Sequence, residues 1–252
     1  MVETISFVGL LIGLMAIVGG HLLEGGHLSS LVQPTAFLIV VGGTVGAVAL
    51  QSRSAVFFSG VRLIKWIFVS PDLDSESIIN RVVGWSALAR KEGMLRLDEE
   101  IAHVQSLFER RGLQMLVDGV EPEQLGDAMD IEIGAYEQQM KLACKVWESA
   151  GGYSPTIGIL GAVMGLIHVM ENLSEPAKLG SGIAVAFVAT IYGVALANIV
   201  FLPISKKLQS TVDELVVLRE MYVDGLIAMS SGTNPRLIEA RMRGYLVRPS
   251  EN

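Results

Sequence analysis

Four long stretches of this chain contain no aspartate, glutamate, lysine or arginine, and they constrain its fold more than any other feature. The stretches are residues 5–23, 34–51, 151–170 and 181–205. A bilayer core about 30 Å thick is crossed by roughly 20 helical residues, so each stretch approaches or reaches that length. Only 18% of all residues are charged and 51% are hydrophobic. The sequence therefore predicts an integral membrane protein with four transmembrane spans and excludes a disordered chain.

The basic residues predict which side of the membrane each loop occupies. Of the 19 lysines and arginines, eleven lie between Arg53 and Lys145 and seven lie from Lys206 onward. Loops rich in these residues stay in the cytoplasm. Loops 24–33 and 171–180 are therefore expected outside, and both termini are expected in the cytoplasm.

These boundaries divide the chain into four parts. They are two transmembrane helices (1–51), a cytoplasmic helical domain (52–150), two further transmembrane helices (151–205) and a cytoplasmic helical tail (206–252). The fourth span is expected to continue as a helix past Lys206. In the tail, Asn234 and Pro235 predict the cap and first residue of a new helix.

The cytoplasmic domain is predicted to be helical. Apolar residues at helical spacing begin near Ile78, and Gly93 is expected to end that helix. A second helix is expected to end near Gly112 and to carry Leu97, Ile101, Val104, Leu107 and Phe108. A third is expected to start at Pro122 and run unbroken into the third span. No alternating pattern favours a strand, so the fold class is all-α.

The sequence contains no pattern typical of an enzyme or a metal site. Hydrolase and nucleotide-binding motifs are missing, and the histidines lack metal-ligand spacing. We expect no catalytic residue, no metal and no cofactor. A net charge of −7 without a basic stripe argues against nucleic-acid binding. The one cysteine, Cys144, is expected to be a packed thiol.

Small residues form one narrow face on each of the last two spans. The third span carries Pro155, Gly158, Ala162 and Gly165, and the fourth carries Ala186, Thr190, Gly193 and Ala197. Small residues let another helix approach closely. One interpretation is ordinary packing within the helix bundle, in which Thr190 bonds its own backbone. The other is a wall around a partner helix or a pore.

Two prolines in the spans, and the absence of carboxylates from them, bear on whether the chain transports ions. Pro155 and Pro203 lie near the inner ends of the third and fourth spans and could permit a hinge. None of the four spans contains a carboxylate, although ion pathways through membranes use ionisable residues. If the chain moves ions, a partner is expected to supply the acid.

A charged stretch in the cytoplasmic domain has two interpretations. Arg90, Lys91 and Glu92 precede Gly93, and a second group follows it, namely Arg96, Asp98, Glu99 and Glu100. Such a run is usually a solvated helix surface. The alternative is a docking surface for a charged partner.

Taken in order, several strings resemble the flagellar motor stator A-subunit family, MotA and PomA, which is related to TolQ and ExbB. They are LIVVGGT, ARKEGMLRLDEEI, SPTIGILGAVMGLIHVM, ATIYGVALANIVFLPISKKL and GTNPRLIEA. The resemblance implies a bacterial inner-membrane protein that forms a homopentamer around two MotB-like B subunits. A B-subunit helix would carry the ion-binding aspartate, and ion flow would turn the ring against the rotor protein FliG.

The resemblance also implies roles for individual residues. Arg90 and Asp98 match the family's rotor-contact positions, with Lys91 and Glu99 as contributing neighbours. Pro155 and Pro203 match the prolines of the conformational step. Thr190 matches the hydroxyl residue that faces the ion site. The two small-residue faces would then be where B-subunit helices pass.

The transported ion is expected to be a proton. Relatives that use sodium carry a threonine where this chain has Ala162, and an aspartate where it has Gln33. A partly dehydrated sodium ion needs several oxygen ligands, whereas a proton on a carboxylate needs none. Two alternatives stay open: a TolQ- or ExbB-like energiser of an outer-membrane system, and a non-conducting scaffold.

Overall fold

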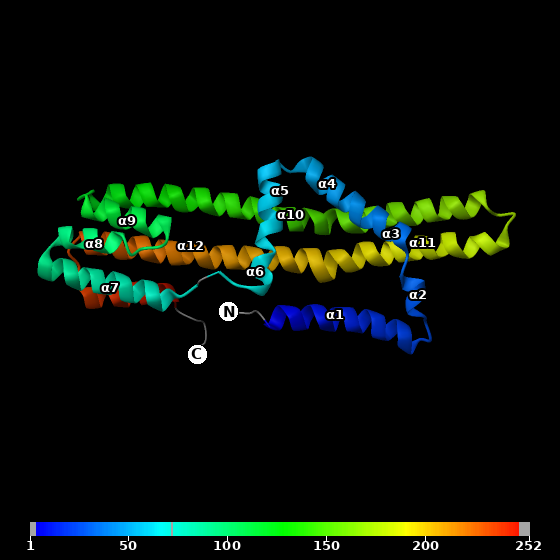
Figure 1. The fold of residues 1–252 in the computed structure, drawn as a ribbon, viewed down its shortest axis with the longest axis horizontal. Coiled ribbons are helices and arrows are strands. Elements are labelled where there is room, and N and C mark those ends of the chain that lie inside the picture. Colours follow the sequence, from blue (N-terminus) through cyan, green and yellow to red (C-terminus); the bar gives the residue numbers. More distant parts are fainter. Residues whose placement is uncertain (1–3, 72, 247–252) are drawn as a thin grey trace. The chain divides into compact units, whose positions relative to one another are not determined.

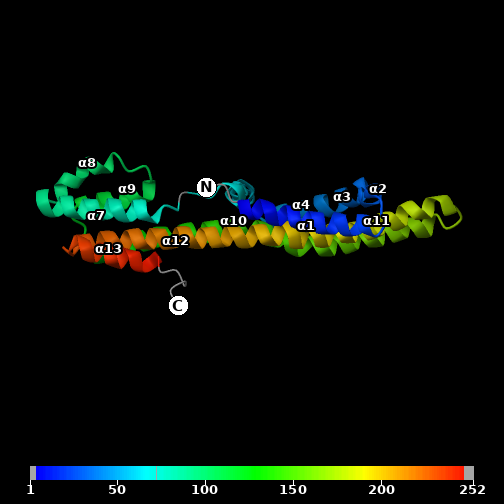
Figure 2. The same cartoon turned by 90° about the horizontal axis from the view of Figure 1, so that it is seen from below.

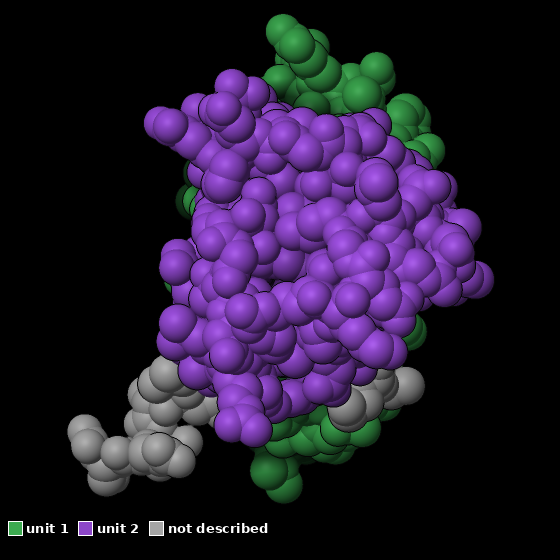
Figure 3. Space-filling model, turned by 90° about the vertical axis from the view of Figure 1, so that its left-hand side faces the viewer, with its two compact units in different colours: residues 1–71, 139–211 green, residues 72–138, 212–252 purple. Residues whose placement is uncertain are grey.

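The computed structural model describes residues 4–71 and 73–246, and helices make up its regular structure (Figure 1). None of these residues forms a β-strand element, so the predicted all-α class is confirmed. The chain divides into two compact units (Figure 3). Unit 1 comprises residues 1–71 and 139–211, and unit 2 comprises residues 72–138 and 212–252.

Unit 1 contains the apolar helices. In chain order they are α1 (Thr4–Leu23), α2 (Leu28–Leu31), α3 (Pro34–Phe37), the π-helix η1 (Leu38–Gly42), α4 (Gly43–Gln51), α5 (Ser54–Leu63), α6 (Lys65–Phe68), the end of α10 (Pro122–Glu171), α11 (Pro176–Ala195), the π-helix η3 (Leu196–Phe201) and the start of α12 (Leu202–Ser230). Helix α10 is continuous over 50 residues, as predicted from Pro122.

Four helical segments of the described chain are long and apolar enough to cross a membrane. They are Thr4–Leu23, Leu28–Gln51, Pro122–Glu171 and Leu179–Ser230. Each contains or overlaps one predicted span. Helix α1 has no buried residue, so its apolar side chains are open to lipid or to another helix.

Span two is held to the fourth span by a small apolar core and a polar tether. Ala36 and Val40 pack against Val188 and Ala189, all at most 4% exposed. The Tyr192 hydroxyl donates to the Leu31 carbonyl at 2.5 Å. The tether fixes the chain where it enters span two.

Unit 2 is a packed helical domain. It contains α7 (Ser75–Glu92), the 3₁₀-helix η2 (Met94–Leu97), α8 (Asp98–Ile101), α9 (Leu107–Val117), the start of α10, the end of α12, α13 (Pro235–Arg243) and the 3₁₀-helix η4 (Gly244–Leu246). Helix α13 packs along α7 (Figure 2).

Two predicted helix ends in unit 2 are confirmed. Helix α7 ends at Gly93, whose φ of +90° favours glycine. Helix α13 begins with Pro235, and the side chain of Asn234 accepts a hydrogen bond from the Arg236 amide at 3.0 Å.

The prediction of one helix from Leu97 to Gly112 is wrong. The chain forms η2 and α8, turns, and starts α9 at Leu107, where Ser106 caps it by accepting from the Glu109 amide. Gly112 lies inside α9, where the absence of a side chain allows the helix to pack closely. A Cβ at Gly112 would come within 2.8 Å of Leu226.

Candidate functional site

Helices α10 and α11 run side by side in unit 1 (Figures 1 and 2). Their small-residue faces pack directly on each other. A Cβ added to Gly158 would lie 2.8 Å from the Ala189 carbonyl oxygen, and one added to Gly193 would lie 2.6 Å from the Ser154 carbonyl oxygen. A Cβ added to Gly165 would lie 2.8 Å from the Ala186 amide nitrogen. The three glycines therefore bring two backbones of the same chain into contact, as the first interpretation expects.

Two other residues of the small-residue faces, Ala162 and Thr190, are less buried than the glycines. Ala162 and Thr190 are partly exposed, whereas Ala186 and Ala197 are buried. The Thr190 hydroxyl donates to the Ala186 carbonyl at 3.4 Å, which is the expected backbone bond. Thr190 also lines a shallow groove of about 360 Å³ between α1 and α11. The assignment of this face to a partner helix stays a prediction.

Asn198 was not predicted as a site residue. It lines the same groove as Thr190, and its amide nitrogen donates to the Val194 carbonyl at 2.9 Å. A possible signal was present, since Asn198 is the only side-chain amide between residues 181 and 205. Polar groups at membrane depth often bond across helices.

The two prolines occupy different local settings. Pro155 lies inside α10, which continues through it, and is partly buried. Pro203 is exposed and is the second residue of α12, directly after the π-helix η3. A proline removes one backbone donor, and π-turns mark changes of helical register. The role of the two prolines as hinges stays a prediction. Helical periodicity in the sequence does not reveal the π-helix before Pro203.

The four predicted rotor-contact residues are all exposed at one end of α7 and on α8 in unit 2. The Lys91 ammonium lies 3.3 Å from the Glu92 carboxylate, and the Glu99 carboxylate forms an ion pair with Arg96. The Glu99 carboxylate raises the pKa of Arg96 above its ordinary value. Arg90 and Asp98 make no ion pair within the described part of the chain. Their charges are therefore available to another protein.

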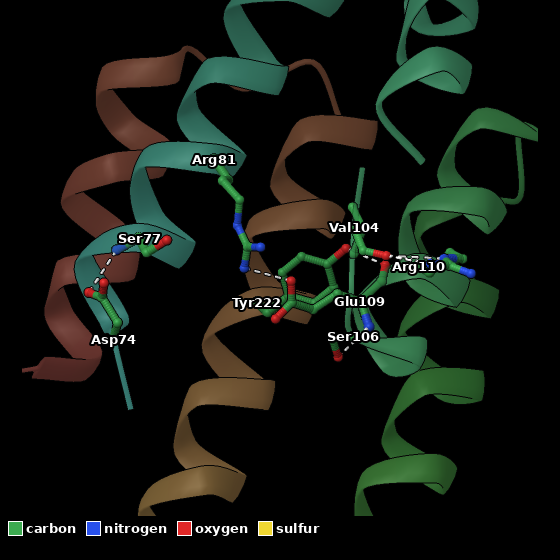
Figure 4. Close-up of polar contacts among 8 residues, drawn as sticks. All are labelled: Asp74, Ser77, Arg81, Val104, Ser106, Glu109, Arg110 and Tyr222. Atoms are coloured by element: carbon green, nitrogen blue, oxygen red, sulfur yellow. Dashed lines mark hydrogen bonds and ion pairs between the residues drawn. The ribbon is translucent and has the colours of Figure 1, made fainter. Parts of the chain in front are cut away.

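A polar cleft of about 560 Å³ lies between α7, α9 and α12 in unit 2 (Figure 4). Arg81 donates to the Glu109 carboxylate at 2.6 Å, and the Tyr222 hydroxyl donates to the Glu109 carbonyl at 2.6 Å. Burial raises the pKa of Tyr222 well above its usual value, so the phenol stays protonated.

Arg219 also lines this cleft. Its guanidinium lies 3.4 Å from the Tyr136 ring centroid and 4.8 Å from that of Phe108. Burial lowers the pKa of Arg219, and the two aromatic faces stabilise its charge. No pattern in the sequence predicts this cleft, because its residues come from separate helices. Within residues 4–71 and 73–246, no group of histidine, cysteine and carboxylate side chains could hold a metal ion.

Known protein families and relatives match nearly the whole chain. The model of the MotA/TolQ/ExbB proton channel family matches residues 100–221, and the model of the motility protein A N-terminal region matches residues 7–92. Motility protein A of Bacillus subtilis is 33% identical over 242 residues, covering 96% of this chain and 90% of that protein.

Two solved structures are similar as well. The structure of MotAB from C. jejuni superposes with a TM-score of 0.93 at 26% identity, covering 99% of this chain and 98% of that one. The flagellar MotAB stator complex from Bacillus subtilis gives a TM-score of 0.86 at 32% identity, covering 96% and 95%. The chain therefore belongs to the MotA/TolQ/ExbB proton channel family, and it carries the N-terminal region of motility protein A.

Proposed function

We propose that this chain is the A subunit of a bacterial flagellar motor stator, which converts an ion-motive force into torque on the rotor. The observation that carries the proposal is the match to MotAB stator structures over almost the entire chain, at a TM-score of up to 0.93. The match of residues 7–92 to the motility protein A N-terminal region favours a stator over a TolQ- or ExbB-like energiser.

A MotB-like B subunit completes the ion pathway. The four predicted spans of this chain carry no carboxylate, and a proton crossing the membrane needs an ionisable carrier. The similar solved structures contain a MotA together with a MotB. We therefore assign the proton-binding acid to a B-subunit helix that contacts Thr190.

The assembly we propose is a homopentamer of this chain around two B subunits in the inner membrane, with both termini in the cytoplasm. The distribution of basic residues supports this orientation. Helix α1 has no buried residue, so it offers an apolar surface to lipid and to neighbouring subunits.

Arg90 and Asp98 make the contact with the rotor, since both are exposed and lack ion pairs in the described structure. The partner is the rotor protein FliG. Opposite charges across such a contact set encounter rate and specificity.

The first experiment expresses this chain with its B subunit in a strain that lacks stators. Restored swimming supports the proposal, and well-inserted protein that neither restores swimming nor conducts protons refutes it. Arg90→Glu and Asp98→Lys then test rotor contact. Both should reduce torque several-fold and leave membrane insertion and proton conduction unchanged. Loss of insertion would instead make these charges structural.

A further inference from the structure

Leu95 is the most exposed large apolar side chain among the described residues of unit 2, at 79%. It lies between the two pairs of predicted rotor-contact residues, after Arg90 and Lys91 and before Asp98 and Glu99. A single exposed leucine is ordinary on a protein surface. Its surroundings set this one apart.

The backbone on both sides of Leu95 is fixed. Gly93 turns the chain at the end of α7, and Leu97 and Ile101 are buried at 0% and 9% exposure. The Trp85 indole nitrogen donates to the Glu100 carboxylate at 3.4 Å. Leu95 therefore lies on an ordered 3₁₀-helix, and a partner that covers it does not have to order its backbone.

The frame around Leu95 has the composition of a protein interface. Arg90 precedes Leu95 in the sequence and Asp98 follows it, and the two carry opposite charges without an ion pair in the described structure. A cleft of about 190 Å³ lies beside Arg90, and its walls include Met94 and the α12–α13 turn with Ser230 and Thr233. Binding surfaces commonly place an apolar anchor within a polar rim.

We propose that Leu95 is the apolar anchor of the rotor contact and that this contact extends over the Arg90 cleft to the α12–α13 turn. The surface fits a rotor-protein face with an apolar side chain between an acidic group, opposite Arg90, and a basic group, opposite Asp98. The inference rests on the proposed function and adds to it an apolar contribution that charge complementarity alone does not supply.

Functional variants test the anchor. Leu95→Ala should reduce recruitment of stators to the motor and stall torque by roughly tenfold, and Leu95→Asn should reduce both at least as much. The matched control is Leu107→Ala, because Leu107 is 67% exposed. Its neighbours Ser106 and Phe108 line the cleft at the other end of α7, beside Asp74 and Ser77. The control should swim normally.

Proton conduction separates a failed anchor from a failed stator. Leu95→Ala should conduct protons with its B subunit as well as the unaltered chain does. The proposal is overturned if Leu95→Ala swims as well as Leu107→Ala. If charge reversal at Arg90 and Asp98 still reduces torque in that case, the stator function stands and only the anchor fails.

A photo-crosslinking amino acid at position 95 identifies the occupant. A crosslink to the rotor protein that is absent when the same group stands at position 107 is the expected result. A crosslink only to a second copy of this chain would show that Leu95 lies between subunits, and the proposal would be wrong.

Discussion

At the residue scale, two buried serines in unit 1 differ in their hydrogen bonding. The Ser205 hydroxyl donates to the Cys144 carbonyl at 3.2 Å and accepts from the Gln209 side-chain amide at 3.2 Å, whereas the Ser154 side chain has no hydrogen-bond partner within the described structure. Their exposures are 1% and 0%. A buried hydroxyl without a partner is destabilising, whereas a paired one contributes about 1 kcal/mol. Comparing the two serines therefore measures the effect of the hydrogen bond on stability while the burial of the side chain stays nearly the same.

We expect Ser205→Ala to lower the melting temperature of the purified complex, because the hydrogen bonds of the Ser205 hydroxyl with the Cys144 carbonyl and the Gln209 side-chain amide are both lost. Ser154→Ala should leave the melting temperature unchanged or raise it, because no hydrogen bond is lost. Thermal unfolding of both variants, purified with the B subunit in the same detergent, gives the comparison. An equal loss of stability in both would show that Ser154 has a partner.

Tyr222 predicts a pH dependence of stability in unit 2. Its pKa is raised well above 10.0, chiefly by burial. Below pH 10 the phenol is protonated in both the folded and the unfolded chain, so its stabilising contribution is fully present. As the pH rises further, the unfolded phenol ionises and the folded one does not, so the free energy of unfolding falls until the folded-state pKa is reached.

Denaturant titrations at pH 8 and near pH 11 measure this effect. The unaltered chain should lose more stability over that interval than Tyr222→Phe, which has no ionisable phenol. At pH 8 the variant should be the less stable of the two, because it lacks the hydrogen bond to Glu109. Identical losses in both chains would mean that Tyr222 keeps an ordinary pKa.

At the scale of elements, the contact between α10 and α11 depends on glycine. The Cα of Gly193 lies so close to α10 that an added Cβ would fall 2.6 Å from the Ser154 carbonyl oxygen. Backbone atoms cannot move aside as a flexible side chain can. Gly46 in α4 is a matched control, since nothing lies within 4 Å of the position its Cβ would take.

Gly193→Ala should therefore separate the two helices and destabilise the complex by about 1–3 kcal/mol or more. Gly46→Ala should be neutral or mildly stabilising, because alanine favours helix over glycine by about 1 kcal/mol. Yield of assembled complex and melting temperature are the readouts. Normal assembly of Gly193→Ala would contradict the close packing described here.

The elements also show which features a sequence pattern can predict. The four spans follow from hydropathy, and Gly93 and Asn234 follow from local backbone chemistry. The helix break before Leu107 was missed because apolar spacing continued across it, although Ser106 was available as a cap. Gly112 was misread as a helix end because its close packing on Leu226 depends on a distant helix.

At the scale of the whole molecule, the two predicted functional regions belong to different units. Thr190, Ala162 and their neighbours lie in unit 1, and the rotor-contact residues lie in unit 2. Helices α10 and α12 contribute residues to both units. The resemblance supplied these roles, whereas composition and periodicity alone gave only membrane spans and a charged surface. A pathway completed by another chain cannot be read from one sequence.

The choice of ion belongs to this scale, because it determines what energises the complete motor. Ala162 has no side-chain oxygen, so Thr190 is the only residue of the two small-residue faces that offers one. Partly dehydrated sodium needs several oxygen ligands, whereas a proton on the carboxylate that we propose for the B subunit needs none. We therefore expect motors built from this chain to turn in sodium-free medium and to stop when the proton gradient is collapsed.

Swimming speed in a stator-null strain, recorded across a sodium series at constant ionic strength, measures the dependence on sodium. A sodium-driven stator in the same strain is the control, and its speed should rise with sodium while that of this chain stays constant. A speed that follows sodium would mean that the partner subunit and Thr190 suffice to coordinate the larger ion. The alanine at position 162 would then carry no selectivity.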